Sequence, residues 1–160
     1  MRAAEPRRDA GSSKAWRLRY VSTLAVLPVL LFIEDDDLVR RAVSRTLQGQ
    51  FAITPYASAE PALGEIDAGK LFDAILCDLI LTGMSGEQMY AALAVRSAAY
   101  PPRLVILTGS PQLGLFAEQL GPRFMTKPCS MPALIRLLLA VSSPRLTSVT
   151  PRATPNVDDE

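Results

Sequence analysis

Four short apolar runs of this sequence are each followed by polar residues suited to binding a metal ion or a phosphoryl group. Glu34 and Asp35 follow the first of these runs, and Asp78 follows another. Thr108 and Lys127 follow two later runs. If the runs are parallel strands of one sheet, their carboxyl ends share an edge, which is where such sheets bind ligands. We therefore expect these side chains to meet there.

The expected cluster contains oxygen ligands and one ammonium group. Two carboxylates about 4 Å apart repel by roughly 4 kcal/mol at an effective dielectric near 20, so the cluster needs a cation. The chain has no histidine, and carboxylates with carbonyls and water favour a hard ion such as Mg²⁺. Thr108 and Lys127 could then bind the oxygens of a transferred phosphoryl group. Asp78 stands alone after its strand, so it is the expected nucleophile, while Glu34 and Asp35 hold the metal.

The elements that must position these residues alternate along the chain. Apolar runs predict strands at 29–33, 51–56, 74–77, 104–107 and 123–126, and helical spacing predicts helices up to Gly49, after Ser58, over 86–96, between 111 and 120, and after Ser130. This alternation implies right-handed crossovers. We predict a doubly wound α/β fold, a (βα)5 flavodoxin-like three-layer sandwich with a parallel five-stranded sheet.

The first predicted helix shows the spacing of an amphipathic helix. Its expected buried face consists of Val39, Ala42, Val43, Thr46 and Leu47. Arg40, Arg41 and Arg45 are expected to form a solvated face, and Asp36 and Asp37 a solvated first turn, where acidic groups suit the helix dipole.

Composition indicates one ordinary domain with two flanking segments. The 160 residues carry 17 basic and 16 acidic side chains, and 49% of the residues are hydrophobic, which excludes a fully disordered chain. Residues 1–27 form a basic arm and residues 142–160 a Ser-, Thr- and Pro-rich tail, both expected to be disordered. The domain is expected over 28–141.

A membrane or nucleotide function is not favoured by the sequence. The apolar run 21–33 behind the basic arm is shorter than the roughly 20 residues that span a bilayer, and it ends in acidic residues. The arm could touch nucleic acid or acidic lipid, but a solvated tail is preferred, and no nucleic acid partner is expected. Glycine-rich phosphate loops are absent. The two cysteines, Cys77 and Cys129, suit a reducing cytoplasm, the expected location.

At the polar residues described above, the sequence resembles the receiver domain of two-component response regulators, over residues 28–141. The resemblance is carried by the segments 32–40, 78–86, 106–109 and 124–128, which run Phe-Ile-Glu-Asp-Asp-Asp-Leu-Val-Arg, Asp-Leu-Ile-Leu-Thr-Gly-Met-Ser-Gly, Ile-Leu-Thr-Gly and Phe-Met-Thr-Lys-Pro. They are similar to the family's acidic pair, phosphoacceptor strand end with its loop, switch hydroxyl and Lys-Pro pair.

The resemblance implies a role for each matched position. Asp78 would be phosphorylated, with Mg²⁺ as the cofactor. Asp35 would contact the metal directly and Glu34 mainly through water, and the backbone carbonyl of Ile80 would complete the protein ligands. Thr108 and Lys127 would bind the phosphoryl group, and Phe124 would be an aromatic switch that moves with Thr108. The peptide bond between Lys127 and Pro128 would be cis.

Two departures from the family pattern alter the expectations. Thr82 stands where the family usually has proline, which should loosen the loop after Asp78. Only nineteen positions separate Thr108 from Lys127, so the fourth helix is expected to be short or irregular. In addition, Ile80 and Gly109 are expected to flank the approach of water to Asp78, so Ile80→Asn should change the lifetime of a phosphoryl adduct.

The expected function is that of a stand-alone response regulator receiver in a phosphorelay. A histidine kinase or histidine phosphotransfer protein would phosphorylate Asp78, and the modified chain would signal to a downstream protein, with no enzymatic activity beyond self-catalysed phosphorylation and dephosphorylation. A homodimer could form through the fourth helix, fifth strand and fifth helix. Two alternatives are a Mg²⁺-dependent phosphohydrolase with an aspartate nucleophile and a receiver-like interaction module that works without phosphate.

Overall fold

Five parallel strands form the central sheet of the computed structural model, which describes residues 26–109, 116, 120, 121 and 123–142. The strands are β1 (Val29–Ile33), β2 (Ala52–Tyr56), β3 (Ala74–Asp78), β4 (Leu104–Thr108) and β5 (Phe124–Thr126). Their order is β2-β1-β3-β4-β5, and every neighbouring pair is parallel. The order of the strands reverses at β1, which pairs with β2 on one side and with β3 on the other. The predicted doubly wound, flavodoxin-like fold is confirmed.

The strands are buried on both faces, as their continuous apolar runs predict. β3 and β4 have every residue buried. Successive side chains point to opposite faces, so each run feeds two apolar cores: Leu31, Ile33, Ile75, Cys77, Leu104 and Ile106 belong to one, and Leu30, Phe32, Ala74, Leu76, Val105 and Leu107 to the other. β3 and β4 extend one residue beyond the predicted ends, so Asp78 and Thr108 lie within the strands.

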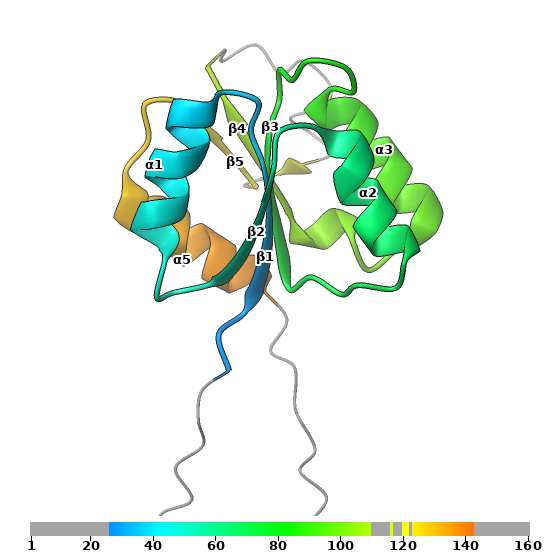
Figure 1. Ribbon diagram of the computed structural model, residues 1–160, viewed down its shortest axis with the longest axis horizontal. Helices are drawn as coiled ribbons and strands as arrows, with labels where there is room; N and C mark the ends of the chain where they lie inside the picture. Colours follow the sequence, from blue (N-terminus) through cyan, green and yellow to red (C-terminus); the bar gives the residue numbers. More distant parts are fainter. Residues whose placement is uncertain (1–25, 110–115, 117–119, 122, 143–160) are drawn as a thin grey trace, which may run out of the picture.

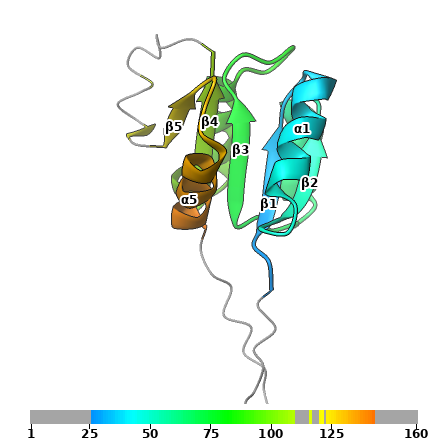
Figure 2. The same ribbon diagram turned by 90° about the vertical axis from the view of Figure 1, so that its left-hand side faces the viewer.

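Helices cover both faces of the sheet (Figures 1 and 2). The helices α1 (Asp37–Leu47) and α5 (Met131–Val141) lie on one face, and α2 (Ala59–Asp67) and α3 (Gly86–Arg96) lie on the other. The short 3-10 helix η1 (Pro101–Arg103) precedes β4. Ser58 and Ser130 occupy the predicted N-cap positions of α2 and α5, and the predicted bounds of α3 are confirmed.

The helix α1 differs from its prediction in which residues it buries. Leu47 is buried and Val43 packs beside it, but Ala42 and Thr46 are exposed. The predicted buried face was therefore too wide. Figure 2 shows α1 lying over β1 and β2, at one side of the sheet. Asp36 starts the helix by accepting hydrogen bonds from the backbone N–H groups of Leu38 and Val39, a capping role.

Several predictions fall on residues outside the described part of the chain. These include most of the basic arm, most of the tail and most of the expected fourth helix. Of that helix, Phe116 and Leu120 are described, and both are helical and buried. Within the described ranges, no helix is both long and apolar enough to cross a membrane.

The close approach of α3 to the end of β3 depends on Gly86. A Cβ atom at Gly86 would lie 2.8 Å from the carbonyl oxygen of Asp78 and 3.0 Å from the Cα atom of Leu79. Both are backbone atoms, which cannot move aside without shifting the strand end. Ser85 and Gln88 form a capping box that fixes the start of α3 at this point.

We predict that Gly86→Ala lowers the free energy of unfolding by about 1–3 kcal/mol, because an added methyl group overpacks the junction of α3 and β3. Urea unfolding measures the change. Gly64→Ala is the matched control, since a Cβ there meets nothing within 4 Å in α2; it should raise the free energy of unfolding by about 0.5–1 kcal/mol. Equal free energies of unfolding for the two variants would contradict the predicted overpacking at Gly86.

Candidate functional site

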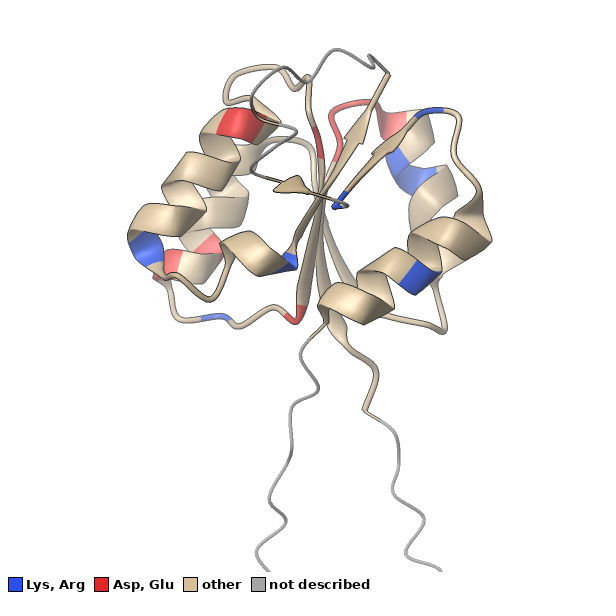
Figure 3. Cartoon of the chain, turned by 180° about the vertical axis from the view of Figure 1, so that it is seen from behind, with Lys and Arg blue, Asp and Glu red and all other residues tan. Residues whose placement is uncertain are grey.

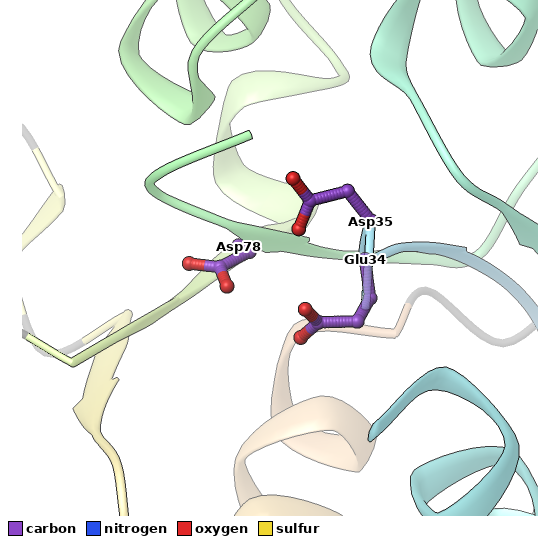
Figure 4. Close-up of side chains that lie close together, drawn as sticks. All are labelled: Glu34, Asp35 and Asp78. Carbon is purple, nitrogen blue, oxygen red and sulfur yellow. The ribbon is translucent and has the colours of Figure 1, made fainter. Parts of the chain in front are cut away.

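Three carboxylates meet at the carboxyl edge of the sheet (Figure 4). Glu34 follows β1 directly, Asp35 is the next residue, and Asp78 ends β3. One oxygen atom of each residue lies within 4.8 Å of one oxygen of each of the others. Glu34 and Asp78 are buried, whereas Asp35 is exposed. In Figure 3, acidic positions mark the upper ends of the central strands and continue into α1. The convergence expected from the strand ends is thus present.

The ammonium group of Lys127 joins two of these carboxylates. Its Nζ atom donates to Oε2 of Glu34 at 2.7 Å and to Oδ2 of Asp78 at 2.6 Å. Burial raises the pKa of Glu34 above its ordinary value, against the opposing effect of the Lys127 hydrogen bond. Burial alone would lower the pKa of Lys127, but hydrogen bonds to Asp78 and Glu34 outweigh it and raise that pKa. The lysine is therefore held in its charged form.

Pairing between the strands places Lys127 and Thr108. Thr108 ends β4 and is paired with Thr126 of β5. The backbone N–H of Lys127 donates to the carbonyl oxygen of Thr108 at 2.7 Å, which continues the ladder by one residue. The Lys127–Pro128 peptide bond is cis, as the resemblance implied. Thr108 is fully buried, and Phe124 is half-buried against the core on the α2 and α3 side.

The Asp78 carboxylate is fixed at both oxygens. Oδ2 accepts from Lys127, and Oδ1 accepts a hydrogen bond from the backbone N–H of Ile80 at 3.1 Å. The Ile80 side chain is 67% exposed beside the site. The neighbouring thiol of Cys77 lies in the core, where burial raises its pKa.

Thr82 connects the loop after β3 to Asp35. Its backbone N–H and its hydroxyl group both donate to Oδ2 of Asp35, at 3.0 and 2.9 Å. The Thr82 side-chain hydrogen bond lowers the pKa of Asp35 below its ordinary value. The loss of proline was expected to loosen this loop, but the threonine supplies two hydrogen bonds that proline cannot make. Asp35 is therefore held in one orientation although it is exposed.

Two further contacts were missed by reasoning from the sequence. Arg40 was expected on a solvated face, but its guanidinium group is partly buried and donates to the carbonyl oxygen of Glu34 at 2.7 Å. Glu60 of α2 accepts a hydrogen bond from the backbone N–H of Met84 at 3.0 Å. Each contact joins a helix to a loop beside the site. Periodicity carries no signal for such contacts, because the loop conformation decides which N–H or carbonyl group is available.

Comparison with known proteins identifies the family of this chain. Residues 30–139 match the model of the response regulator receiver domain. The chain belongs to this family. A comparison with curated protein sequences gave no match.

Solved structures similar to this receiver domain share its fold. The adenylate cyclase from Rhodopirellula baltica is 25% identical with a TM-score of 0.64, and the match covers 72% of this chain and 87% of that chain. The chemotaxis protein CheY4 of Vibrio cholerae is 24% identical with a TM-score of 0.61, covering 72% and 99%. The receiver domain of an HD domain-containing protein from Pseudomonas fluorescens is 20% identical with a TM-score of 0.64, covering 72% and 94%.

The raised pKa of Glu34 generates a prediction for the pH dependence of stability. A raised pKa means that the folded chain binds this proton more tightly than the unfolded chain. Its stabilising contribution is present below the ordinary pKa of 4.5 and is lost as the pH rises through the raised folded value. Glutamine does not titrate, so the Glu34→Gln variant does not lose stability in this way as the pH rises. The free energy of unfolding of the variant, relative to the wild-type chain, should therefore rise over that pH range and then level off.

Urea unfolding at a series of pH values, without divalent metal ions, measures this difference. The comparison uses the change with pH and not the offset at one pH, because the offset also contains the altered hydrogen bond to Lys127. A difference that stays flat from pH 4 upward, or that falls, would contradict the prediction.

Proposed function

We propose that this receiver domain accepts a phosphoryl group on Asp78 from a histidine kinase or a histidine phosphotransfer protein and signals through protein contacts. The observation that carries the proposal is the Asp78 carboxylate, which ends a buried strand within hydrogen-bonding distance of Lys127 and beside two further carboxylates. Family membership supports it, because the match includes every residue of this site. The proposal includes a cytoplasmic location, in keeping with the two free thiols.

The donor set of the site fits Mg²⁺. Glu34, Asp35 and Asp78 offer carboxylate oxygens only, which suits a hard divalent ion. We assign the protein ligands to Asp35, Asp78 and the backbone carbonyl of Ile80, with Glu34 acting mainly through water. When bound, the ion supplies positive charge that offsets the negative charge of the carboxylates and of a phosphoryl group. The chain's own residues then determine how that group is oriented.

The transfer itself requires one nucleophile and groups that bind the phosphoryl oxygens. A carboxylate oxygen of Asp78 attacks the phosphorus atom of a phosphohistidine, an oxygen–phosphorus bond forms, and the phosphorus–nitrogen bond breaks. The imidazole nitrogen that leaves takes up a proton. Lys127 and Thr108 are assigned to the phosphoryl oxygens, which carry the charge during the transfer. Turnover as an enzyme is not part of the proposal, beyond self-catalysed phosphorylation and dephosphorylation.

Output follows from the charge that the adduct adds. Phosphorylation introduces about −1.5 to −2 charges at neutral pH, which draws Lys127 and Thr108 toward the new group. We assign Phe124 to the accompanying switch, because it starts β5 and is only half-buried in this structure. The face that comprises β4, the expected fourth helix and β5 would then change its affinity for a downstream protein. A homodimer would form through the expected fourth helix, β5 and α5.

Asp78→Asn should abolish adduct formation, because an amide is not a nucleophile for phosphorus at neutral pH. The measurement is intact-protein mass spectrometry after incubation with acetyl phosphate and MgCl₂. The wild-type chain should gain one phosphoryl group. Asp67→Asn, an exposed aspartate at the far end of α2, is the matched control and should be labelled like the wild-type chain.

Incubation with acetyl phosphate, and separately with a phosphorylated kinase, distinguishes the proposed function from its alternatives. Release of many equivalents of phosphate by each chain would favour a phosphohydrolase. The absence of any adduct on the wild-type chain with either acetyl phosphate or a phosphorylated kinase would favour an interaction module without phosphate. Both results would overturn the proposal.

Ile80→Asn should shorten the lifetime of the adduct. The side chain of Ile80 is exposed beside Asp78, and an amide in its place can hold water there by hydrogen bonding. Loss of the phosphoryl group from the labelled chain is followed by mass spectrometry after removal of the donor. Ile80→Leu keeps an apolar side chain of similar size and should decay like the wild-type chain. Equal decay rates for the Asn and Leu variants would refute an obstructing role for Ile80.

A further inference from the structure

The carboxylate of Asp35 differs from the other two in how it is held. Glu34 and Asp78 are buried and share Lys127. Asp35 is exposed and lies outside that pair of ion bridges. An exposed aspartate ordinarily rotates among several rotamers, and fixing such a side chain upon binding costs conformational entropy. The groups that hold Asp35 before any ligand binds therefore influence how well it can act as a ligand.

Both hydrogen-bond donors of Thr82 act on a single oxygen of that carboxylate. The backbone N–H and the hydroxyl converge on Oδ2 of Asp35, which fixes the rotation of the carboxylate as well as its position. Partners of this kind behind a metal ligand orient it and improve metal binding. Thr82 therefore acts on the acidic cluster through its side chain as well as through its backbone.

We propose that Thr82 is a positioning residue that holds the Asp35 carboxylate in the orientation needed to bind a divalent cation with Glu34 and Asp78. The inference rests on the proposed function, because it takes Asp35 to be a metal ligand. It goes beyond that function by assigning a task to a residue that departs from the family pattern. In this proposal Thr82 acts through Asp35 and is not assigned as a ligand of the metal or of the phosphoryl group.

The loop that carries Thr82 is anchored at a second point. Gly83 has a φ of +90°, and the next residue, Met84, donates its backbone N–H to Oε1 of Glu60. This anchor lies on α2 and does not touch Asp35. The two anchors can be removed separately, which distinguishes an effect on the carboxylate from an effect on the stiffness of the loop.

The experiment measures Mg²⁺ affinity by isothermal titration calorimetry on the full chain, without any phosphoryl donor. Thr82→Val keeps the branched shape and the backbone N–H but removes the hydroxyl group, and it should weaken Mg²⁺ binding about tenfold. Thr82→Ser keeps the hydroxyl group and should bind Mg²⁺ nearly as well as the wild-type chain. Glu60→Ala releases the other anchor and should also leave the affinity close to the wild-type value.

The outcomes distinguish this inference from the proposed function. Urea unfolding without metal establishes that each variant is folded before titration. Wild-type affinity in Thr82→Val, or equal weakening in Thr82→Ser or Glu60→Ala, would overturn the role of Thr82 while leaving the metal site intact. Failure of the wild-type chain to bind Mg²⁺ would instead overturn the proposed metal site, and the role of Thr82 with it.

Discussion

The bridge from Lys127 to Glu34 and Asp78 is the interaction on which the site depends. It joins residues from the ends of three strands, with Nζ–oxygen distances of 2.7 and 2.6 Å. One oxygen of each of these two buried carboxylates lies within 4.8 Å of one oxygen of the other. Without a cation between them, the two carboxylates would repel by several kcal/mol. The bridge in turn requires β1, β3, β4 and β5 to be in register, because Lys127 reaches the acids only when its backbone continues the ladder from Thr108.

The charge balance of the site explains why one ammonium group does not saturate it. Three carboxylates and one ammonium leave two negative charges at the edge of the sheet. Burial of Glu34 and Asp78 strengthens the repulsion between these two carboxylates, since charges interact more strongly away from water. A divalent cation would neutralise this excess. A phosphoryl group on Asp78 would restore negative charge at the point where Lys127 already lies. The lysine would then interact with both Glu34 and the phosphoryl group.

The sequence was sufficient to predict the strands and their polar ends, because buried parallel strands are continuous apolar runs and polar residues end those runs. Asp78 and Lys127 were found in this way. Burial in α1 was overestimated, because spacing shows where apolar side chains lie on a helix but not how much of the helix the sheet covers. The contacts of Thr82, Arg40 and Glu60 involve loop N–H or carbonyl groups, whose directions are set by the folded loops and not by residue spacing.

These contacts divide the surroundings of the site into two halves. Asp35 is joined through Thr82 to the loop after β3, and that loop is joined to α2 through Glu60. Asp78 is joined through Lys127 to the end of β5 and, by the strand ladder, to Thr108. A ligand held by Asp35 therefore acts first on the loop and α2, whereas a displacement of Lys127 acts first on β4 and β5. Asp78 precedes that loop and contacts Lys127, and Glu34 precedes Asp35 and contacts Lys127, so both buried acids connect the two halves.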